Sequence, residues 1–458
     1  MFDRSANPVG PHCGTERSFD QPAFGAAFRN TCTQEWMIWS LAIWGRYEIR
    51  GGALECIVVG GGWAGLAVSG ELTARGIQHR LFERHRIAET WRTQRWDSFR
   101  INTPRHQTVM PGERDTSGDP DGAMPVAEFI ALMQDYAGRR GLPVECGREV
   151  RRIEPHGRGY RIELDRETVL SRCVVVASGD QNVAVRPALA ANVPDAVAQY
   201  DATSYRNPTS MPEGAVLVVG SGQSGGQIAE DLIRAGREVY LSTSRVARQT
   251  HSYRGRHSMA WMVDTGIMDI PKANLLAAGP IPTRALVGAD HTISLQSLSA
   301  QGVQLLGRLT AIDAGRAHFD SDVSVNVAFG DTTAAETKAR IDAWLTANGI
   351  MAPAARTDPA ETVVPTLPDP AILELDLTQS VGSVVWCTGV RGDYTFLRVP
   401  AVLDNRGAPI ESGGLTRVAG LCIAGVPYSV SRRSGTILAA APDAERMVNH
   451  VEMVLRSN

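Results

Sequence analysis

The sequence lacks long hydrophobic runs and any excess of charge. Its longest apolar stretch near the N-terminus, residues 36–45, has ten residues, whereas a bilayer span needs about 20. A positively charged flank and a small-residue cleavage site are missing around this stretch, which argues against a secretory signal. With 46 basic and 49 acidic residues, no global field favours nucleic acid. We therefore expect a cytoplasmic protein with no membrane span and no nucleic-acid partner.

Cysteine is scarce and scattered. The seven cysteines never stand in a C-x-x-C pair, which excludes a disulfide framework and the usual zinc patterns and indicates a reducing compartment. None of the ten histidines falls at metal-ligand spacing, so no metal is expected. A length of 458 residues with 43% hydrophobic and 21% charged residues is ordinary for a globular protein of two or three domains.

Two glycine-rich loops dominate what is present. The first, VVGGGWAGLA at residues 58–67, follows an apolar run and opens a helical stretch that Gly76 should stop. The second, VVGSGQSGGQ at residues 218–227, repeats the plan, with Gly236 as the stop. Adding 160 to the glycine positions of the first unit gives those of the second. The chain thus contains two copies of one strand, loop, helix and strand unit.

Such a loop binds a dinucleotide pyrophosphate, because its glycines allow a tight turn, close approach of the phosphates and close packing of helix on strand. The helix N-terminus adds free N–H groups and partial positive charge. A glycine-rich turn without a ligand is the alternative reading. The expected binding residues of the two loops are Gly60, Gly62, Trp63, Ala64 and Gly65, and Gly220, Gly222, Gln223, Ser224 and Gly225.

The two units differ at the end of their second strands. The first unit has Glu83, 21 residues after Gly62, placed to accept hydrogen bonds from a ribose 2′-hydroxyl, as FAD or NAD requires. Arg84 follows it as a further candidate. The second unit has Ser242 and Thr243 followed by Arg245, which favours a 2′-phosphate. We expect FAD at the first loop and NADPH at the second, with a solvated Arg245 as the alternative.

The sequence also resembles the flavin-containing monooxygenase superfamily, the class B flavoprotein monooxygenases, over residues 54–451. The resemblance depends on ordered segments: ETWRTQRWDSFRINTP at 89–104, VVVASGDQN at 174–182, QYDATSYRNP at 199–208, VVWCTGV at 384–390, and the stretch from residue 421 to 447. It implies that NADPH reduces FAD, that a C4a-hydroperoxyflavin forms with O2, and that a small organic substrate is oxygenated.

The resemblance also implies site residues. Asn102 would stand beside flavin and nicotinamide, with a turn-forming role as the alternative. Trp91 and Arg92 would border the FAD, or simply pack, and Val150 would meet the adenine through its backbone. A helix beginning after Gly435 would direct its positive end at the flavin. Ser434 and Gly435 are therefore flavin candidates, and the remaining cofactor-binding candidates are Ser178, Gly179, Thr388 and Gly389.

The chain departs from the family pattern in the linker before the second loop, where Asp201 replaces a histidine. We expect Asp201 to affect the coupling of NADPH oxidation to oxygenation. Two alternatives stay open: an FAD-dependent NADPH reductase or oxidase without oxygen transfer, including a disulfide-reductase type, and a dinucleotide sensor without turnover.

The expected fold class is α/β, with two doubly wound, Rossmann-like domains and the NADPH domain inserted in the FAD domain. The boundaries follow from the motifs: a loosely ordered extension at 1–53, FAD domain at 54–184 and 381–458, and NADPH domain at 185–380. The Pro-rich residues 352–370 should form a connecting loop. A homodimer is compatible with this organisation.

Overall fold

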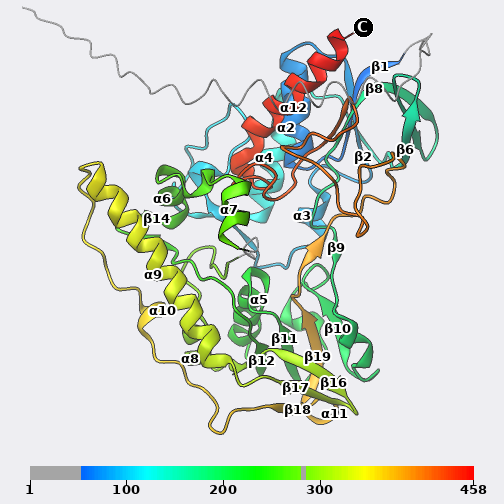
Figure 1. The fold of residues 1–458 in the computed structure, drawn as a ribbon. Coiled ribbons are helices and arrows are strands. Elements are labelled where there is room, and N and C mark those ends of the chain that lie inside the picture. Colours follow the sequence, from blue (N-terminus) through cyan, green and yellow to red (C-terminus); the bar gives the residue numbers. More distant parts are fainter. Residues whose placement is uncertain (1–52, 280–284, 458) are drawn as a thin grey trace, which may run out of the picture. The chain divides into compact units, whose positions relative to one another are not determined.

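The computed structural model describes residues 53–279 and 285–457 (Figure 1). The predicted N-terminal extension lies outside these residues, apart from Ala53. The described chain forms two α/β units, each built on a mainly or wholly parallel sheet, as the sequence predicts.

The first sheet has the order β5-β2-β1-β8-β7-β6, with β21 beside β8. Strands β5, β2, β1, β8 and β21 pair with one another in parallel. Strand β7 pairs antiparallel with β8, and β6 pairs antiparallel with β7. The order places β1 in the middle, so the first glycine loop leaves the centre of the sheet. The strands are β1 (Leu54–Val59), β2 (His79–Glu83), β5 (Val144–Cys146), β6 (Val150–His156), β7 (Gly159–Leu164), β8 (Thr168–Val176) and β21 (Leu421–Ile423).

Alternate residues of the first sheet point to two different cores. Cys56 and Val58 face the helices, whereas Ile57 and Val59 face the β6–β7 ribbon and residues 394–403. Helices therefore cover one face, and an antiparallel β layer covers the other. The helices of this unit are α2 (Trp63–Ala74), α3 (Glu89–Thr93), α4 (Val126–Arg139) and α12 (Ala440–Arg456). Strands β3 (Arg100–Pro104) and β4 (Ala123–Pro125) form a separate ribbon, and the 3-10 turn η1 (Arg105–Gln107) lies between them in the chain.

The second sheet is wholly parallel in the order β10-β19-β11-β12-β15. Its central strand β11 carries the second glycine loop, and Leu217 and Val218 point to opposite faces. A small antiparallel sheet of β16, β17 and β18 covers one face. The strands are β10 (Ala198–Asp201), β11 (Ala215–Val219), β12 (Val239–Ser242), β15 (Gln304–Leu306), β16 (Leu309–Asp313), β17 (Arg316–Phe319), β18 (Glu374–Asp376) and β19 (Val381–Trp386).

The helices of the second unit include one that the sequence analysis missed, the 25-residue α9. The predicted helix after the second loop is present as α5, and Gly236 ends it with a φ of +79°. The helices are α5 (Gln223–Arg234), α6 (Ser258–Asp264), α7 (Lys272–Ala278), α8 (Leu295–Ala300), α9 (Val323–Ala347), α10 (Pro359–Thr362) and α11 (Leu377–Ser380). A short ribbon joins β13 (Ser252–Tyr253) and β14 (Arg256–His257).

One strand lies in a different sheet from the one predicted. Residues 381–386 were expected to begin the second part of the FAD domain, but β19 pairs with β10 and β11. The return to the first sheet comes later, through β20 (Val390–Arg391), which pairs antiparallel with β9 (Val183–Ala184). The two connections between the sheets therefore run side by side as a two-stranded ribbon.

Candidate functional site

The first glycine loop is shaped by contacts that leave no room for side chains. Gly60 has a φ of +111°, and a Cβ there would lie 2.3 Å from the Ala177 carbonyl oxygen. A Cβ on Gly65 would lie 2.0 Å from the Gly60 oxygen. At Gly62, the N-cap of α2, a Cβ would meet nothing within 4 Å. Two of the glycines are thus required by packing, and the middle one leaves open space at the start of a helix.

Glu83 stands at the end of β2 and holds this loop. Its Oε2 accepts a hydrogen bond from Gly61 N at 2.7 Å, and its Oε1 accepts one from His85 N at 2.8 Å. Arg84 is exposed, with Nη1 4.0 Å from a carboxylate oxygen of Glu149. Val150, the first residue of β6, is partly buried and packs against the core on the ribbon side of the first sheet.

The end of β8 lies against the same loop. Ala177 N donates to Val59 O at 2.7 Å, so Ser178 and Gly179 follow directly beside Gly60. The Ser178 Oγ is buried and has no hydrogen-bond partner among the described residues. Gly179 has a φ of +91°. An open helix start, an acidic strand end and an orphaned buried hydroxyl therefore meet at the first loop.

The C-terminal segment also reaches the first loop. A Cβ on Gly425 would lie 3.3 Å from the Ala64 Cβ and 4.0 Å from Trp63, so these two residues contact the turn after β21. Ser434 is buried, and its Oγ accepts hydrogen bonds from Val430 N and Ser431 N. Gly435 has a φ of +76° and packs on Pro427. These contacts shape the turn between β21 and the last helix.

The last helix begins later than predicted. A 3-10 turn, η5 (Ile437–Ala439), follows Gly435, and α12 itself begins at Ala440. Residues 436–439 have extended or 3-10 geometry because Thr436 N donates back to Arg433 O, which closes a turn before the helix. Ser434 and Gly435 therefore belong to that turn and not to the first turn of the helix.

Trp91 and Arg92 lie on the short helix α3. The Trp91 ring packs edge-on against Phe129, with ring centroids 4.9 Å apart, and the Arg95 guanidinium lies over it. Arg92 Nε donates to Ile87 O at 3.2 Å. The described contacts of Trp91 are thus those of aromatic packing, the alternative that the sequence left open.

The second loop repeats the geometry of the first. A Cβ on Gly225 would lie 1.7 Å from the Gly220 oxygen, and one on Gly220 would lie 2.6 Å from the Cys387 oxygen. Cys387 N donates to Val219 O at 2.9 Å. Cys387 therefore does at the second loop what Ala177 does at the first. Gln223 and Ser224 form the first turn of α5, whose N-cap is Gly222.

This geometry corrects the prediction for Thr388 and Gly389. Both were predicted to bind a cofactor from the second part of the FAD domain, but they follow β19 and so stand beside the second loop, as Ser178 and Gly179 stand beside the first. The Thr388 Oγ1 donates to Val185 O, in the connecting ribbon. Sheet membership, which depends on long-range strand pairing, decides the difference.

Ser242 and Thr243 do not have the predicted exposure to a 2′-phosphate. The Ser242 Oγ donates to Gly307 O and accepts from Leu309 N, and Ser242 is 2% exposed. The Thr243 Oγ1 donates to Leu306 O and accepts from Asn326 Nδ2, and Thr243 is 1% exposed. Of the predicted set only Arg245 is exposed. The hydroxyls are used inside the unit because β15 and α9 cover this strand end.

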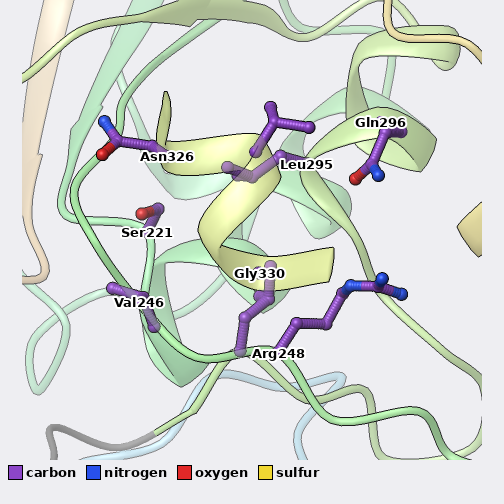
Figure 2. A pocket seen from close by; sticks show the side chains of 9 residues that line it. Ser221, Val246, Arg248, Leu295, Gln296, Asn326 and Gly330 are labelled. Carbon is purple, nitrogen blue, oxygen red and sulfur yellow. The ribbon is translucent and has the colours of Figure 1, made fainter. Parts of the chain in front are cut away.

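A pocket lies beside the second loop, between that loop and α9 (Figure 2). Ser221 of the loop, Arg248 and Asn326 bring polar groups to it, and Val246 and Gly330 also line it. The Asn326 Oδ1 and the Arg248 Nε are buried and lack hydrogen-bond partners among the described residues. Sequence reasoning missed Arg248 and Asn326, although Arg248 follows β12 by only six residues.

Asn102 and Asp201 lie at different places. Asn102 is on β3, and its Oδ1 accepts a hydrogen bond from Gln227 Nε2 of α5 at 2.9 Å. Gln227 Nε2 also donates to Val287 O. Asp201 ends β10 and receives two hydrogen bonds from Arg186, at 2.7 and 3.0 Å. Asn102 thus ties the β3 ribbon to the helix of the second loop, and Asp201 ties the connecting ribbon to the second sheet.

Two histidine rings near the second unit lie against each other, His257 buried and His251 half-buried. The rings of His251 and His257 are 4.7 Å apart, edge to face. Burial lowers the pKa of His257 to about 3, and His257 Nδ1 caps α6 by accepting from Met259 N. Burial likewise lowers the pKa of His251.

His291 gives a pH dependence to the stability. Hydrogen bonds that His291 donates to the carboxylates of Asp290 and, second in effect, Glu230 raise the pKa of His291 to about 9, although Arg234 Nη2 lies 3.3 Å from the His291 Nε2. A histidine pKa raised above its unfolded value of about 6.5 stabilises the fold below that value and ceases to do so as the pH rises towards 9. We expect the free energy of unfolding in urea to fall between pH 6.5 and 9, and to fall less in His291→Gln. The exposed His156→Gln is the matched control; an equal fall in the His291 variant would contradict this prediction.

Comparisons with known proteins agree with these two units. The sequence profile of a family described as pyridine nucleotide-disulphide oxidoreductase matches residues 57–274. An uncharacterized oxidoreductase, CzcO-like, of Geobacillus kaustophilus is 28% identical over 401 residues, which are 87% of this chain and 98% of the relative. Indole-3-pyruvate monooxygenase YUCCA1 of Oryza sativa is 29% identical over 203 residues, 42% of this chain and 48% of that protein.

Among solved structures, the flavin-containing monooxygenase of Stenotrophomonas maltophilia has a TM-score of 0.60 at 17% identity, covering 88% of this chain and 100% of that one. This likeness shows that the two chains share a fold. The predicted resemblance to the flavin-containing monooxygenase superfamily is confirmed. In the described residues no helix is long and apolar enough to cross a membrane, and no three His, Cys, Asp or Glu side chains group as metal ligands.

Proposed function

We propose that the protein is an FAD- and NADPH-dependent monooxygenase that oxygenates a small organic substrate at nitrogen, sulfur or carbon. Bound FAD would supply the chemistry, taking a hydride from the nicotinamide and delivering electrons to O2. The observation that carries the proposal is the repeated unit with unlike strand ends: Glu83 at the first loop, and exposed Arg245 after β12 at the second. One end suits a free ribose and the other a 2′-phosphate.

The residues around the first loop suit FAD. The start of α2 leaves N–H groups at open space beside Gly62, where a pyrophosphate would gain from the helix dipole. Glu83 has lone pairs for ribose hydroxyls in addition to its two backbone bonds. The orphaned Ser178 Oγ would gain the partner that a buried hydroxyl requires.

Oxygen transfer is favoured over disulfide reduction by the state of the cysteines. Cys56, Cys173 and Cys422 are buried in the first sheet, and burial raises the pKa of each thiol. Burial also raises the pKa of Cys387, to about 12. A disulfide reductase needs a reactive thiolate; among the described cysteines only Cys146 is exposed, and the other four thiols are held protonated. A cytoplasmic location and dimerisation remain predictions from the sequence.

The test uses the full chain loaded with FAD and reduced anaerobically with NADPH, then mixed with O2. We expect NADPH to bleach the visible absorbance of the bound flavin. On mixing with O2, we then expect the absorbance of oxidised flavin to recover by way of a spectrum that differs from those of oxidised and reduced flavin, with little release of free peroxide. Direct return with one peroxide per NADPH would instead favour the oxidase alternative, and no bleaching would reject both.

Asn102 is proposed to act where flavin and nicotinamide meet. Asn102→Ala removes an amide beside α5, so we expect flavin reduction by NADPH to continue while the peroxide released per NADPH rises several-fold. The measurement is peroxide yield against NADPH consumed. Gln227→Ala is the matched control, because it removes the same Asn102–Gln227 bond but keeps the Asn102 amide. Equal leakage in both variants would mean that Asn102 only positions α5.

A further inference from the structure

Helix α9 engages the residues that follow β12, where a nucleotide of the second loop would place its ribose. Asn326 Nδ2 donates to the Thr243 Oγ1 at 3.0 Å. The Thr243 hydroxyl donates its proton to Leu306 O, so towards Asn326 it can only accept. The NH2 group of the Asn326 amide must therefore face Thr243. The Asn326 Oδ1 is left buried without a partner. One turn further along α9, a Cβ added to Gly330 would lie 3.5 Å from the Arg248 Cβ.

The same helix holds Arg248. Arg248 Nη2 donates to the Asp331 Oδ1 at 2.5 Å, and Arg248 N donates to the Thr333 Oγ1 at 3.0 Å. Gln296 of α8 donates to both oxygens of Asp331. Arg248 is 5% exposed, yet it lines the pocket next to Ser221 of the glycine loop. A buried arginine at a dinucleotide loop is therefore already paired with a carboxylate of the protein itself.

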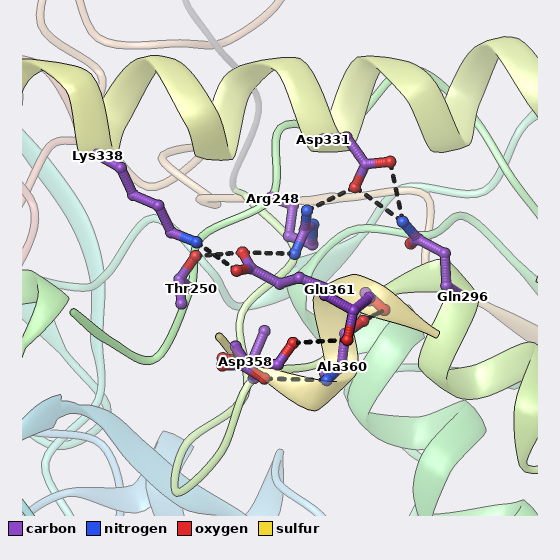
Figure 3. Close-up of polar contacts among 12 residues, drawn as sticks. Arg248, Thr250, Gln296, Asp331, Lys338, Asp358, Ala360 and Glu361 are labelled. Atoms are coloured by element: carbon purple, nitrogen blue, oxygen red, sulfur yellow. Dashed lines mark hydrogen bonds and ion pairs between the residues drawn. The ribbon is translucent and has the colours of Figure 1, made fainter. Parts of the chain in front are cut away.

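The Pro-rich connection locks this arrangement from the other side (Figure 3). Glu361 of α10 accepts from Arg248 Nη1 at 2.8 Å and from Thr250, and it pairs with Lys338 of α9. Burial raises the pKa of Glu361, but the bonds from Lys338 and Thr250 and the charge of Arg248 outweigh it and lower that pKa overall. Two carboxylates thus neutralise Arg248, one from α9 and one from the connection.

We propose that α9 occupies the second nucleotide site as an internal competitor, with the Asp331 carboxylate on Arg248 in the place of a nucleotide 2′-phosphate that Arg245 and Arg248 would otherwise share. A dinucleotide with that phosphate would exchange for Asp331 on the guanidinium, and α9 would release Thr243 and the pocket. A dinucleotide without it would not displace Asp331. This inference rests on the proposed binding of NADPH at the second loop. It makes α9 a device that sets both the affinity and the cofactor preference of the enzyme.

The test compares NADP⁺ and NAD⁺ binding by calorimetry on the full FAD-loaded chain. In Asp331→Asn the competing charge is lost, and we expect NADP⁺ to bind about tenfold more tightly, within the usual range of such couplings, while NAD⁺ binding changes less than twofold. Asp342→Asn is the matched control: it lies on the same helix with similar exposure and pairs with Arg254 instead. Unchanged or weaker NADP⁺ binding in Asp331→Asn would overturn the inference, as would equal tightening for both nucleotides.

Hydrogen exchange gives a second readout that needs no variant. We expect the amides of residues 323–333 to exchange faster when NADP⁺ is bound to the wild-type chain, and those of residues 338–347 to change less. Slower exchange in 323–333 would mean that the nucleotide packs against an unmoved α9, which contradicts the competition. Failure of the proposed function has a different signature: the wild-type chain would then bind neither NADP⁺ nor NAD⁺.

Discussion

Gly225→Ala is expected to yield a protein that keeps its FAD but is no longer reduced by NADPH. A Cβ at this position would lie 1.7 Å from the Gly220 carbonyl oxygen, a distance that real contacts do not reach, so α5 must move away from its strand. The loop that would hold the second pyrophosphate is then lost. The measurements are the FAD content of the purified protein and the rate of flavin bleaching by NADPH, which we expect to fall at least 100-fold, as with other losses of cofactor positioning.

Gly65→Ala is the equivalent substitution in the first loop. Its Cβ would lie 2.0 Å from the Gly60 oxygen, and we expect the protein to be purified without FAD while still binding NADP⁺. The pair of variants separates the two loops, because each makes the same steric error at an equivalent position. If Gly225→Ala lost FAD and Gly65→Ala kept it, the assignment of the loops would be reversed.

Glu83→Ala is expected to weaken FAD binding by on the order of 100-fold, since hydrogen bonds to a charged group contribute about 1.5–3 kcal/mol each. The change removes the acceptor of Gly61 N and His85 N and the proposed acceptor of the ribose hydroxyls. The dissociation constant is measured by titrating the apoprotein with FAD and following flavin fluorescence.

Glu89→Ala is the control for this variant, because Glu89 is close in sequence but pairs with the exposed Arg86. Exposed ion pairs contribute little, so its FAD affinity should stay within about twofold of wild type. An unchanged affinity in Glu83→Ala would place the adenosine ribose somewhere other than the end of β2.

Much of the candidate site could be predicted because its chemistry is local. The order of apolar strand, glycine turn and helix needs only neighbouring residues, and Gly76 and Gly236, with φ of +68° and +79°, end their helices where the sequence indicated. Glu83 was found by its spacing from the loop, since a strand end and a loop in one unit are separated by a fixed length of chain.

Helix α9 escaped prediction because its buried stripe is not hydrophobic. Its buried residues Asn326, Gly330 and Ala334 follow one another at spacing four, and Ile341 and Leu345 continue the same face. A search for apolar periodicity passes over an asparagine and a glycine. The regular spacing of small residues, with no proline from 323 to 347, was the available signal.

The sequence by itself determined the two repeated dinucleotide units, the steric role of their glycines and the acidic end of the first, because each depends on residues a few positions apart. Only the tertiary structure decided that β19 joins the second sheet, that Thr388 and Gly389 therefore stand at the second loop, and that Thr243 and Arg248 are held by α9. Those outcomes depend on pairing and packing between segments far apart in the chain, where several partners compete and local pattern does not choose among them.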